Sequence, residues 1–149
     1  MTTDGALFAW GHNLVGKLGV GDLADRHLPT LLQGELKGAG VAQVSAGAIS
    51  TTCVTLEGTV FVWGAADFSN ADSDGLPGNL LVPTLIGDEL RDKEVAQVAA
   101  GHTHILCVTI EGALYSWGFG EYGKLGLGAG IIAPKPTLVG SALRGKPMA

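Results

Sequence analysis

A unit of about fifty residues occurs three times along the chain, and this repetition constrains the fold more than any other feature. Each copy contains an acidic-Gly pair, a short apolar run and a Trp-Gly pair, at residues 4–11, 57–64 and 111–118. A period of this length is typical of repeat architectures, in which each repeat packs against its neighbours. We therefore expect one domain over residues 1–149, built from repeats 4–56, 57–110 and 111–149.

Within each copy the side chains alternate with period two, which indicates β-strands. In the first copy, Leu7 and Ala9 face one way, and Phe8 and Trp10 face the other. The acidic-Gly pair predicts a hairpin turn before this strand, because glycine accepts a positive φ.

Two alternating stretches precede this strand in the later copies, where residues 41–55 and 95–109 share nine identities in fifteen. A short fourth strand follows it and contains Pro-Thr-Leu, as at residues 83–85. Because proline cannot donate a backbone hydrogen bond, we expect this fourth strand at a sheet edge. Four antiparallel strands in about fifty residues predict one β-propeller blade per repeat, and hence an all-β fold.

The order of the strands predicts an incomplete, open β-propeller of two full blades and a half blade. The chain begins with a third strand, Leu7–Trp10, and residues 143–149 align with residues 36–42, which lead into a first strand. Propellers close with about four to eight blades, so two apolar blade faces are expected to be uncovered. Three explanations are open: the chain is a piece of a longer propeller, it forms a homo-oligomeric ring through its open blade faces, or another protein caps the arc.

The composition limits the class of partner. Hydrophobic residues make up 46% of the chain and charged residues 15%, which predicts a folded protein. The net charge is −5 and the 9 Lys and Arg residues are scattered, which disfavours direct nucleic-acid binding. No signal peptide and no apolar run of transmembrane length is visible. We expect an intracellular protein, cytoplasmic or nuclear, without membrane contact, in which Cys53 and Cys107 are free thiols packed in strands.

A longer motif carries a resemblance to a known family. Residues Gly101–His104 follow Gly-x-x-His, and Val108–Gly128 follow Val-Thr-x-Glu-Gly-x-Leu-Tyr-x-Trp-Gly-x-Gly-x-x-Gly-x-Leu-Gly-x-Gly. This pattern resembles the repeat of the regulator of chromosome condensation family, and the resemblance covers essentially residues 4–147. The resemblance implies a β-propeller.

Several residues suggest a chemistry that their context does not support. His102 and His104 are possible metal ligands or general bases, but His104 stands where the resembling repeat has a His that stabilises a turn by hydrogen bonding. The segment Gly-Lys-Leu-Gly, at 16–19 and 123–126, lacks the Ser or Thr and the helix of a phosphate-binding loop. The acidic loop 67–74 lacks the ligand spacing of an EF-hand. We therefore predict no metal, no cofactor and no catalytic residue.

The three tryptophans, Trp10, Trp63 and Trp117, occupy the same place in each copy. This equivalence predicts that they pack within or between blades rather than stack on a ligand.

We expect a non-catalytic protein-interaction module or scaffold, whose protein partner contacts the loops between the blade strands. The candidate contact residues lie in these loops, and Tyr122 is the expected anchor, because aromatic residues often dominate interfaces. They are His12, Asn13, Lys17, Asp22, Asp25, Arg26, His27, Asp67, Phe68, Glu121, Tyr122 and Lys124.

Two alternative functions are open. The best-known member of the resembling family exchanges guanine nucleotide on a small GTPase, which implies an exchange factor or regulator as the first alternative. The second is a structural fragment, completed by self-association or by a larger assembly such as a ubiquitin-ligase-like multidomain protein.

Overall fold

The computed structural model describes residues 1–2, 5–32, 34–36, 38–70, 77–87 and 89–140. The fold is all-β, as the alternation predicts, and it includes one 3-10 turn, η1 (Glu121–Gly123). The strands are β1 (Phe8–Gly11), β2 (Arg26–Leu31), β3 (Val41–Ala46), β4 (Ser50–Thr55), β5 (Val60–Asp67), β6 (Gly78–Leu85), β7 (Val95–Ala100), β8 (His104–Thr109), β9 (Leu114–Phe119) and β10 (Ile132–Leu138).

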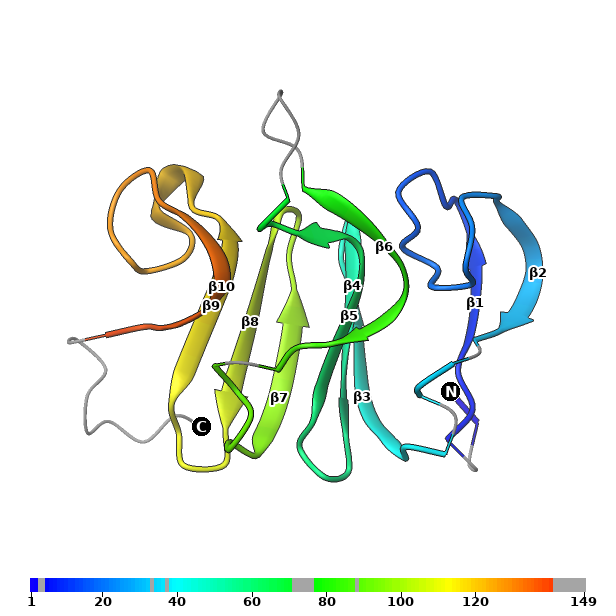
Figure 1. Cartoon of the computed structure of the whole chain (residues 1–149), viewed down its shortest axis with the longest axis horizontal. Helices are drawn as coiled ribbons and strands as arrows, with labels where there is room; N and C mark the ends of the chain where they lie inside the picture. Colours follow the sequence, from blue (N-terminus) through cyan, green and yellow to red (C-terminus); the bar gives the residue numbers. More distant parts are fainter. Residues whose placement is uncertain (3–4, 33, 37, 71–76, 88, 141–149) are drawn as a thin grey trace.

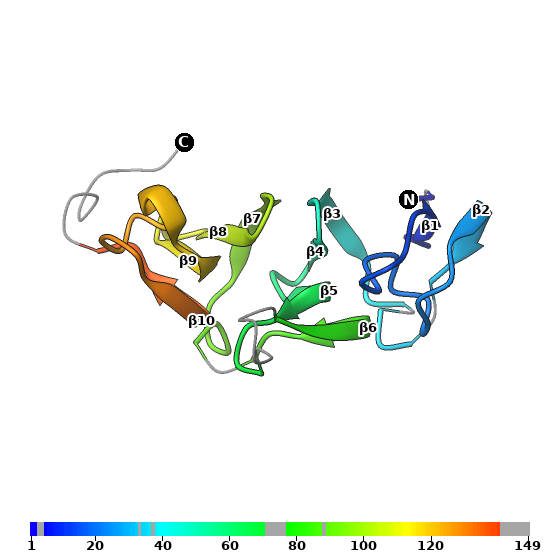
Figure 2. The same cartoon turned by 90° about the horizontal axis from the view of Figure 1, so that it is seen from above.

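The strands form three antiparallel sheets that stand side by side along an open arc (Figures 1 and 2). Strands β1 and β2 form a two-stranded sheet, here called the half blade. Strands β3 to β6 form the middle blade and β7 to β10 form the third blade, each in sequential order. The prediction of two full blades and a half blade is thereby confirmed.

The proline-containing strands β2, β6 and β10 each lie at the edge of their sheet, as predicted. Strands β6 and β10 are longer than expected, with 8 and 7 residues. The register of β10 on β9 shifts between Ala133 and Thr137, the stretch that contains both prolines of this strand. The shift lets each proline lie in the strand without breaking the ladder on either side of it.

Neighbouring blades bury their apolar faces against one another in two clusters. In the first cluster, Val60 and Val62 of the middle blade pack with Trp117 of the third blade. In the second, Leu7 of the half blade packs with Trp63 of the middle blade. Because the middle blade has a neighbour on each side, every residue of β5 except its last is buried.

Side chains of the middle blade also accept hydrogen bonds from backbone N–H groups of the third blade. The N–H of Val98 donates to Oε1 of Gln43 at 3.0 Å, and the N–H of Ala100 donates to Oγ of Ser45 at 2.9 Å. These bonds run from the edge strand of one blade to the edge strand of the next, β3 to β7. They fix the position of the two blades relative to each other more closely than apolar contact alone does.

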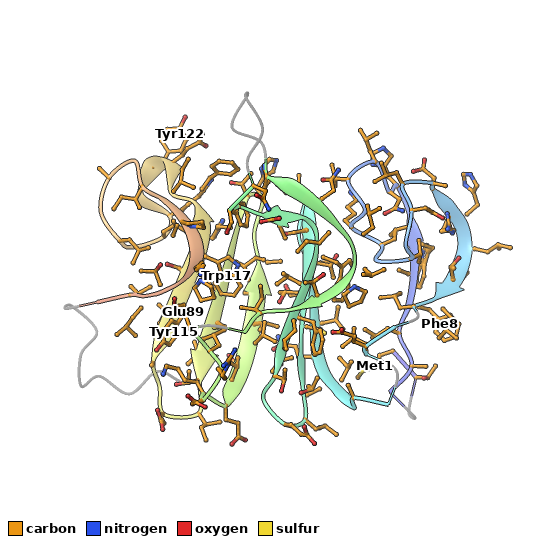
Figure 3. The ribbon with its side chains drawn as sticks, viewed as in Figure 1. Met1, Phe8, Glu89, Tyr115, Trp117 and Tyr122 are labelled. Carbon is orange, nitrogen blue, oxygen red and sulfur yellow. The ribbon has the colours of Figure 1, made fainter. Side chains whose placement is uncertain are left out.

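Two of the three tryptophans confirm the predicted packing between blades, and the prediction is wrong for Trp10. Trp63 and Trp117 are buried, and Figure 3 shows Trp117 among the strands of the third blade. Trp10 is instead 60% exposed, together with its neighbour on the same face, Phe8. The difference has a simple cause, since no described strand packs against that face of the half blade.

Among the described residues, no helix is both long enough and apolar enough to cross a bilayer.

Candidate protein-binding rim

The loops that follow β1 and β9, together with residues 68–70 after β5, lie along one edge of the three sheets, at the top of Figure 1. The turns that precede β4 and β8 share this edge, which we call the loop rim. The opposite edge carries the tight turns between β4 and β5 and between β8 and β9. Loops on a rigid scaffold are a common place for binding residues, because they vary without disturbing the core.

Tyr122 is the most exposed aromatic residue of the loop rim. Its relative exposure is 102%, and Figure 3 shows it at the outer end of the loop that follows β9. It is also the one described non-glycine residue with a positive φ, 58°. A bulky residue in this conformation costs on the order of 1–3 kcal/mol, so the surrounding loop must hold it there.

Hydrogen bonds of Lys124 and Leu125, which follow Tyr122 closely, hold its loop. Nζ of Lys124 donates to Oγ1 of Thr103 at 2.6 Å, and it lies 3.8 Å from a carboxylate oxygen of Glu121. Oγ of Ser116 donates to the carbonyl oxygen of Leu125 at 2.7 Å. The loop is thus bound to the third blade beside the tyrosine, and the tyrosine side chain itself is left in solvent.

Asn13 does not present its side chain to a partner, which corrects the expectation for this residue. It is fully buried, and its Nδ2 donates to the carbonyl oxygens of Asp22 and Ala24 at 2.8 and 3.2 Å. Its Oδ1 accepts from the N–H of Leu18 at 2.9 Å, and its own N–H donates to Oδ1 of Asp25 at 2.7 Å. Asn13 thus stabilises the loop after β1 through hydrogen bonds inside the loop.

Most charged candidates of this loop bond within the chain. Arg26 donates to Oδ2 of Asp22 at 2.6 Å, and this hydrogen bond lowers the pKa of the Asp22 carboxyl. Nζ of Lys17 donates to the carbonyl oxygen of Ala48 in the middle blade, at 3.2 Å. Lys17 therefore links the half blade to its neighbour, although part of its side chain still faces solvent.

Phe68 is the second candidate that the structure places inside. It is buried beside Gly118, and its ring lies edge-on to that of Phe119. The middle copy lacks the Gly-Lys-Leu-Gly segment, and here Phe68 packs its loop against the third blade. Asp67 accepts hydrogen bonds from Ser69 and Asn70 and so shapes the same turn. The remaining aspartates of the acidic loop, Asp72 and Asp74, lie outside the described residues.

A prediction based on polar and aromatic residues misses two exposed apolar residues of the loop after β1. Leu14 and Leu23 are exposed and belong to the loop after β1. Aligning the loops would have found Leu14, because it occupies the place of Glu121. The rim side chains that face solvent include His12, Leu14, Asp22, Leu23, Asp25, His27, Ser69, Asn70, His102, Glu121 and Tyr122.

The His104 side chain stabilises its turn by packing, and its Nδ1 atom makes no hydrogen bond with the described residues. That atom is buried and has no partner among the described residues. The ring instead lies against Gly101, where a Cβ would overlap it, and the N–H of Gly101 donates to the carbonyl oxygen of His104 at 2.8 Å. Burial, with a smaller contribution from Lys124, lowers the pKa of His104. The Gly-x-x-His motif is therefore a packed turn.

The described part of the chain holds no group of three or more His, Cys, Asp or Glu residues that suits a metal ion. Cys53 and Cys107 are free and buried. Burial raises the pKa of each thiol to about 12, so neither is a ready nucleophile near neutral pH.

Comparison with known proteins places this arrangement in context. The 34% identical E3 ubiquitin-protein ligase HERC2 of Homo sapiens matches over 139 residues, 93% of this chain and 3% of that protein. The Ultraviolet-B receptor UVR8 of Arabidopsis thaliana is 35% identical over 128 residues, 86% of this chain and 28% of the receptor. The chain therefore spans a small part of the curated relatives that it matches.

A solved structure shows the same architecture. Prp20p of Saccharomyces cerevisiae, described together with its binding to Gsp1p and histones, superposes with a TM-score of 0.81 at 26% identity. The match covers 97% of this chain and 36% of Prp20p. Models of the regulator of chromosome condensation (RCC1) repeat match residues 4–54, 111–149 and 95–124. These matches and the blade architecture show that the chain belongs to the regulator of chromosome condensation (RCC1) repeat family.

Proposed function

We propose that this chain is a non-catalytic protein-interaction module whose protein partner contacts the loop rim. The observation that carries the proposal is Tyr122, a fully exposed aromatic side chain in a strained backbone conformation. Strained residues cluster at functional sites, and tyrosine is enriched among residues that dominate binding energy.

The chemistry of the rim supports a partner with a mixed surface. Tyr122 and Leu14 offer apolar area, while Glu121 offers an exposed carboxylate next to the tyrosine. An aromatic anchor surrounded by polar groups is typical of protein interfaces. The side chains of Lys17 and Arg26 contribute less free charge, because they already bond within the chain.

Quantitative affinity capture tests the proposal. The chain and a Glu121→Ala, Tyr122→Ala variant are immobilised at equal density, and bound proteins are compared by mass spectrometry. We expect specific partners to fall at least about tenfold on the variant, which corresponds to roughly 1.4 kcal/mol of binding free energy. A Leu56→Ala, Glu57→Ala variant on the opposite edge is the matched control. Equal capture by all three proteins would remove the rim assignment.

A second candidate function is guanine-nucleotide exchange, or its regulation, on a small GTPase. It is favoured by the fold shared with Prp20p, a protein described with its binding to Gsp1p. The chain matches only 36% of Prp20p, so it offers a fraction of that protein's surface. Release of a fluorescent guanine nucleotide from a panel of small GTPases tests this candidate. Acceleration at micromolar chain supports exchange, and rates equal to those with buffer alone exclude it for that panel.

A further inference from the structure

A groove of about 230 Å³ lies between the outer strands of the two four-stranded blades. Leu80, Leu85 and Ile86, in and directly after β6, line one side, and Pro134 and Pro136 of β10 line the other. Figure 2 shows β6 and β10 on the side of the arc away from β3 and β7. Since each of these blades has its four strands, the groove is not the place of a blade strand.

The first copy of the repeat shows how a loop fills the equivalent place one blade earlier. Gly16 lies against Leu81 of β6, and the N–H of Gly21 donates to the carbonyl oxygen of Leu81 at 2.9 Å. The middle copy lacks the Gly-Lys-Leu-Gly segment of this loop. Pro134 occupies the place of Leu81 in the third blade, and it is exposed. The outer surface beside Pro134 is therefore available to another molecule.

The charged groups of the groove favour a cation. Asp67 and Glu89 contribute two carboxylates, and Lys135 contributes one ammonium group, which already interacts within the chain. Asp67 accepts hydrogen bonds from Ser69 and Asn70. The exposed Glu89 carboxylate has no bonded partner among the described residues. Glu89 is therefore the group that a bound cation meets.

The size and the apolar lining limit the ligand further. Sites for drug-sized molecules measure about 300–1,000 Å³, so this smaller groove suits one long side chain. An arginine has an apolar stem, which can lie on Leu85 and Pro136, and a charged head that can reach Glu89. Its planar guanidinium is more weakly hydrated than an ammonium group and can donate two hydrogen bonds to one carboxylate. Arginine therefore fits this combination of groups better than lysine.

We propose that this groove binds an arginine side chain that a protein partner presents between aliphatic residues. The stem of the arginine packs between β6 and β10, and its guanidinium pairs with Glu89. The flanking aliphatic residues cover the exposed side chain of Leu85. The site is separate from Tyr122 and does not depend on binding at the loop rim.

The probe for this site is a capped synthetic peptide, Ala-Leu-Arg-Leu-Ala, titrated into the isotope-labelled chain. NMR follows the amides of Gly87, Glu89 and Lys135, and a second peptide with norleucine in place of arginine keeps the apolar stem without the charge. Two protein variants alter the groove itself. Glu89→Gln removes its unpaired charge, and Glu35→Gln, at the equivalent exposed position of the first copy, is the matched control.

Gly87→Leu fills the groove, because a Cβ at Gly87 meets no other atom within 4 Å. Gly140→Leu is its matched control, since Gly140 is equally open and occupies the same place in the third blade. Circular dichroism checks that every variant is folded. The Glu121→Ala, Tyr122→Ala variant of the loop rim is titrated alongside, which separates this site from the proposed rim contact.

We expect saturable shifts at the three amides with the arginine peptide. The norleucine peptide, and the arginine peptide on Glu89→Gln, should each bind at least about threefold more weakly, as expected for an exposed ion pair. Gly87→Leu should weaken binding by at least about tenfold, and the two matched controls and the rim variant should bind like the wild-type chain. No saturable shift, equal affinity of the two peptides, or unchanged binding to Gly87→Leu would overturn the proposal. Loss of binding in the rim variant would assign the peptide to the loop rim and would also overturn it.

Discussion

The rings of Phe68 and Phe119 meet edge to face, with their centroids 5.6 Å apart and their planes at 88°. Phe68 follows β5 of the middle blade, and Phe119 ends β9 of the third blade. The pair therefore joins the two blades directly beneath the loop rim. Edge-to-face pairs stabilise beyond the area that they bury, so this contact connects blade packing to the placement of the loops.

Replacing Phe68 should destabilise the chain strongly. Because its ring is buried, we expect Phe68→Ala to lower the free energy of unfolding by about 3–4 kcal/mol. Tyr122→Ala, which removes a fully exposed ring, should change it by less than about 0.5 kcal/mol. Urea denaturation followed by tryptophan fluorescence measures both. Similar losses for the two variants would contradict the division between packing and contact residues.

Removing the Asn13 side chain should open the loop after β1. Asn13→Ala leaves the buried N–H of Leu18 and the carbonyl oxygens of Asp22 and Ala24 without this partner, so we expect a loss of about 2 kcal/mol. Leu14→Ala, in the same loop but exposed, is the control and should be nearly neutral. The comparison uses urea denaturation under identical conditions. A neutral Asn13→Ala would show that its hydrogen bonds do not hold the loop.

A double-mutant cycle tests the turn formed by Gly101 and His104. A Cβ at residue 101 would overlap the imidazole ring, so Gly101→Ala should destabilise the chain by about 1–2 kcal/mol. In a His104→Ala background the ring is gone, and the same change should cost at least about 0.5 kcal/mol less. Thermal unfolding of the four proteins gives the coupling. Additive effects would mean that the motif does not act through this contact.

The two thiols should make the stability depend on pH in the alkaline range. Burial raises the pKa of Cys53 and Cys107 from 9.0 to about 12. Between these values the unfolded chain loses thiol protons that the folded chain keeps, so the free energy of unfolding falls as pH rises above about 9. Replacing both cysteines with valine should flatten this fall, measured by urea denaturation between pH 8 and pH 10. As a second readout, Ellman's reagent should react with both thiols only in denaturant.

The fold was largely predictable because the repeat carries its own register. The alternation around Trp63 and Trp117 predicts which face is buried, and the strand sets follow from aligning the copies. The exposure of Trp10 was not predicted, because its equivalence to Trp63 and Trp117 in sequence does not show which strands pack against it. The lengths of β6 and β10 were not predictable, because they depend on register shifts that proline allows but does not specify.

The candidate site was predictable only in outline. Loop position could be inferred, but the direction of a side chain within a loop depends on contacts between residues distant in sequence. Asn13 and Phe68 turned inward for this reason, one to bond the loop and the other to pack on Phe119. Tyr122 turned outward because Lys124 and Leu125, beside it, are the residues that bind the loop to the blade.

The most direct test of the central claim is site-specific photo-crosslinking along the two edges of the blades. A photoreactive phenylalanine analogue replaces Tyr122 on the loop rim or Leu56 on the opposite edge, both of them exposed. Each protein is irradiated in cell extract, and its crosslinked partners are identified by mass spectrometry. If the loop rim is the contact surface, residue 122 captures a reproducible partner that wild-type chain competes away, and residue 56 does not. Capture of the same partner at residue 56 and not at residue 122 would contradict the account.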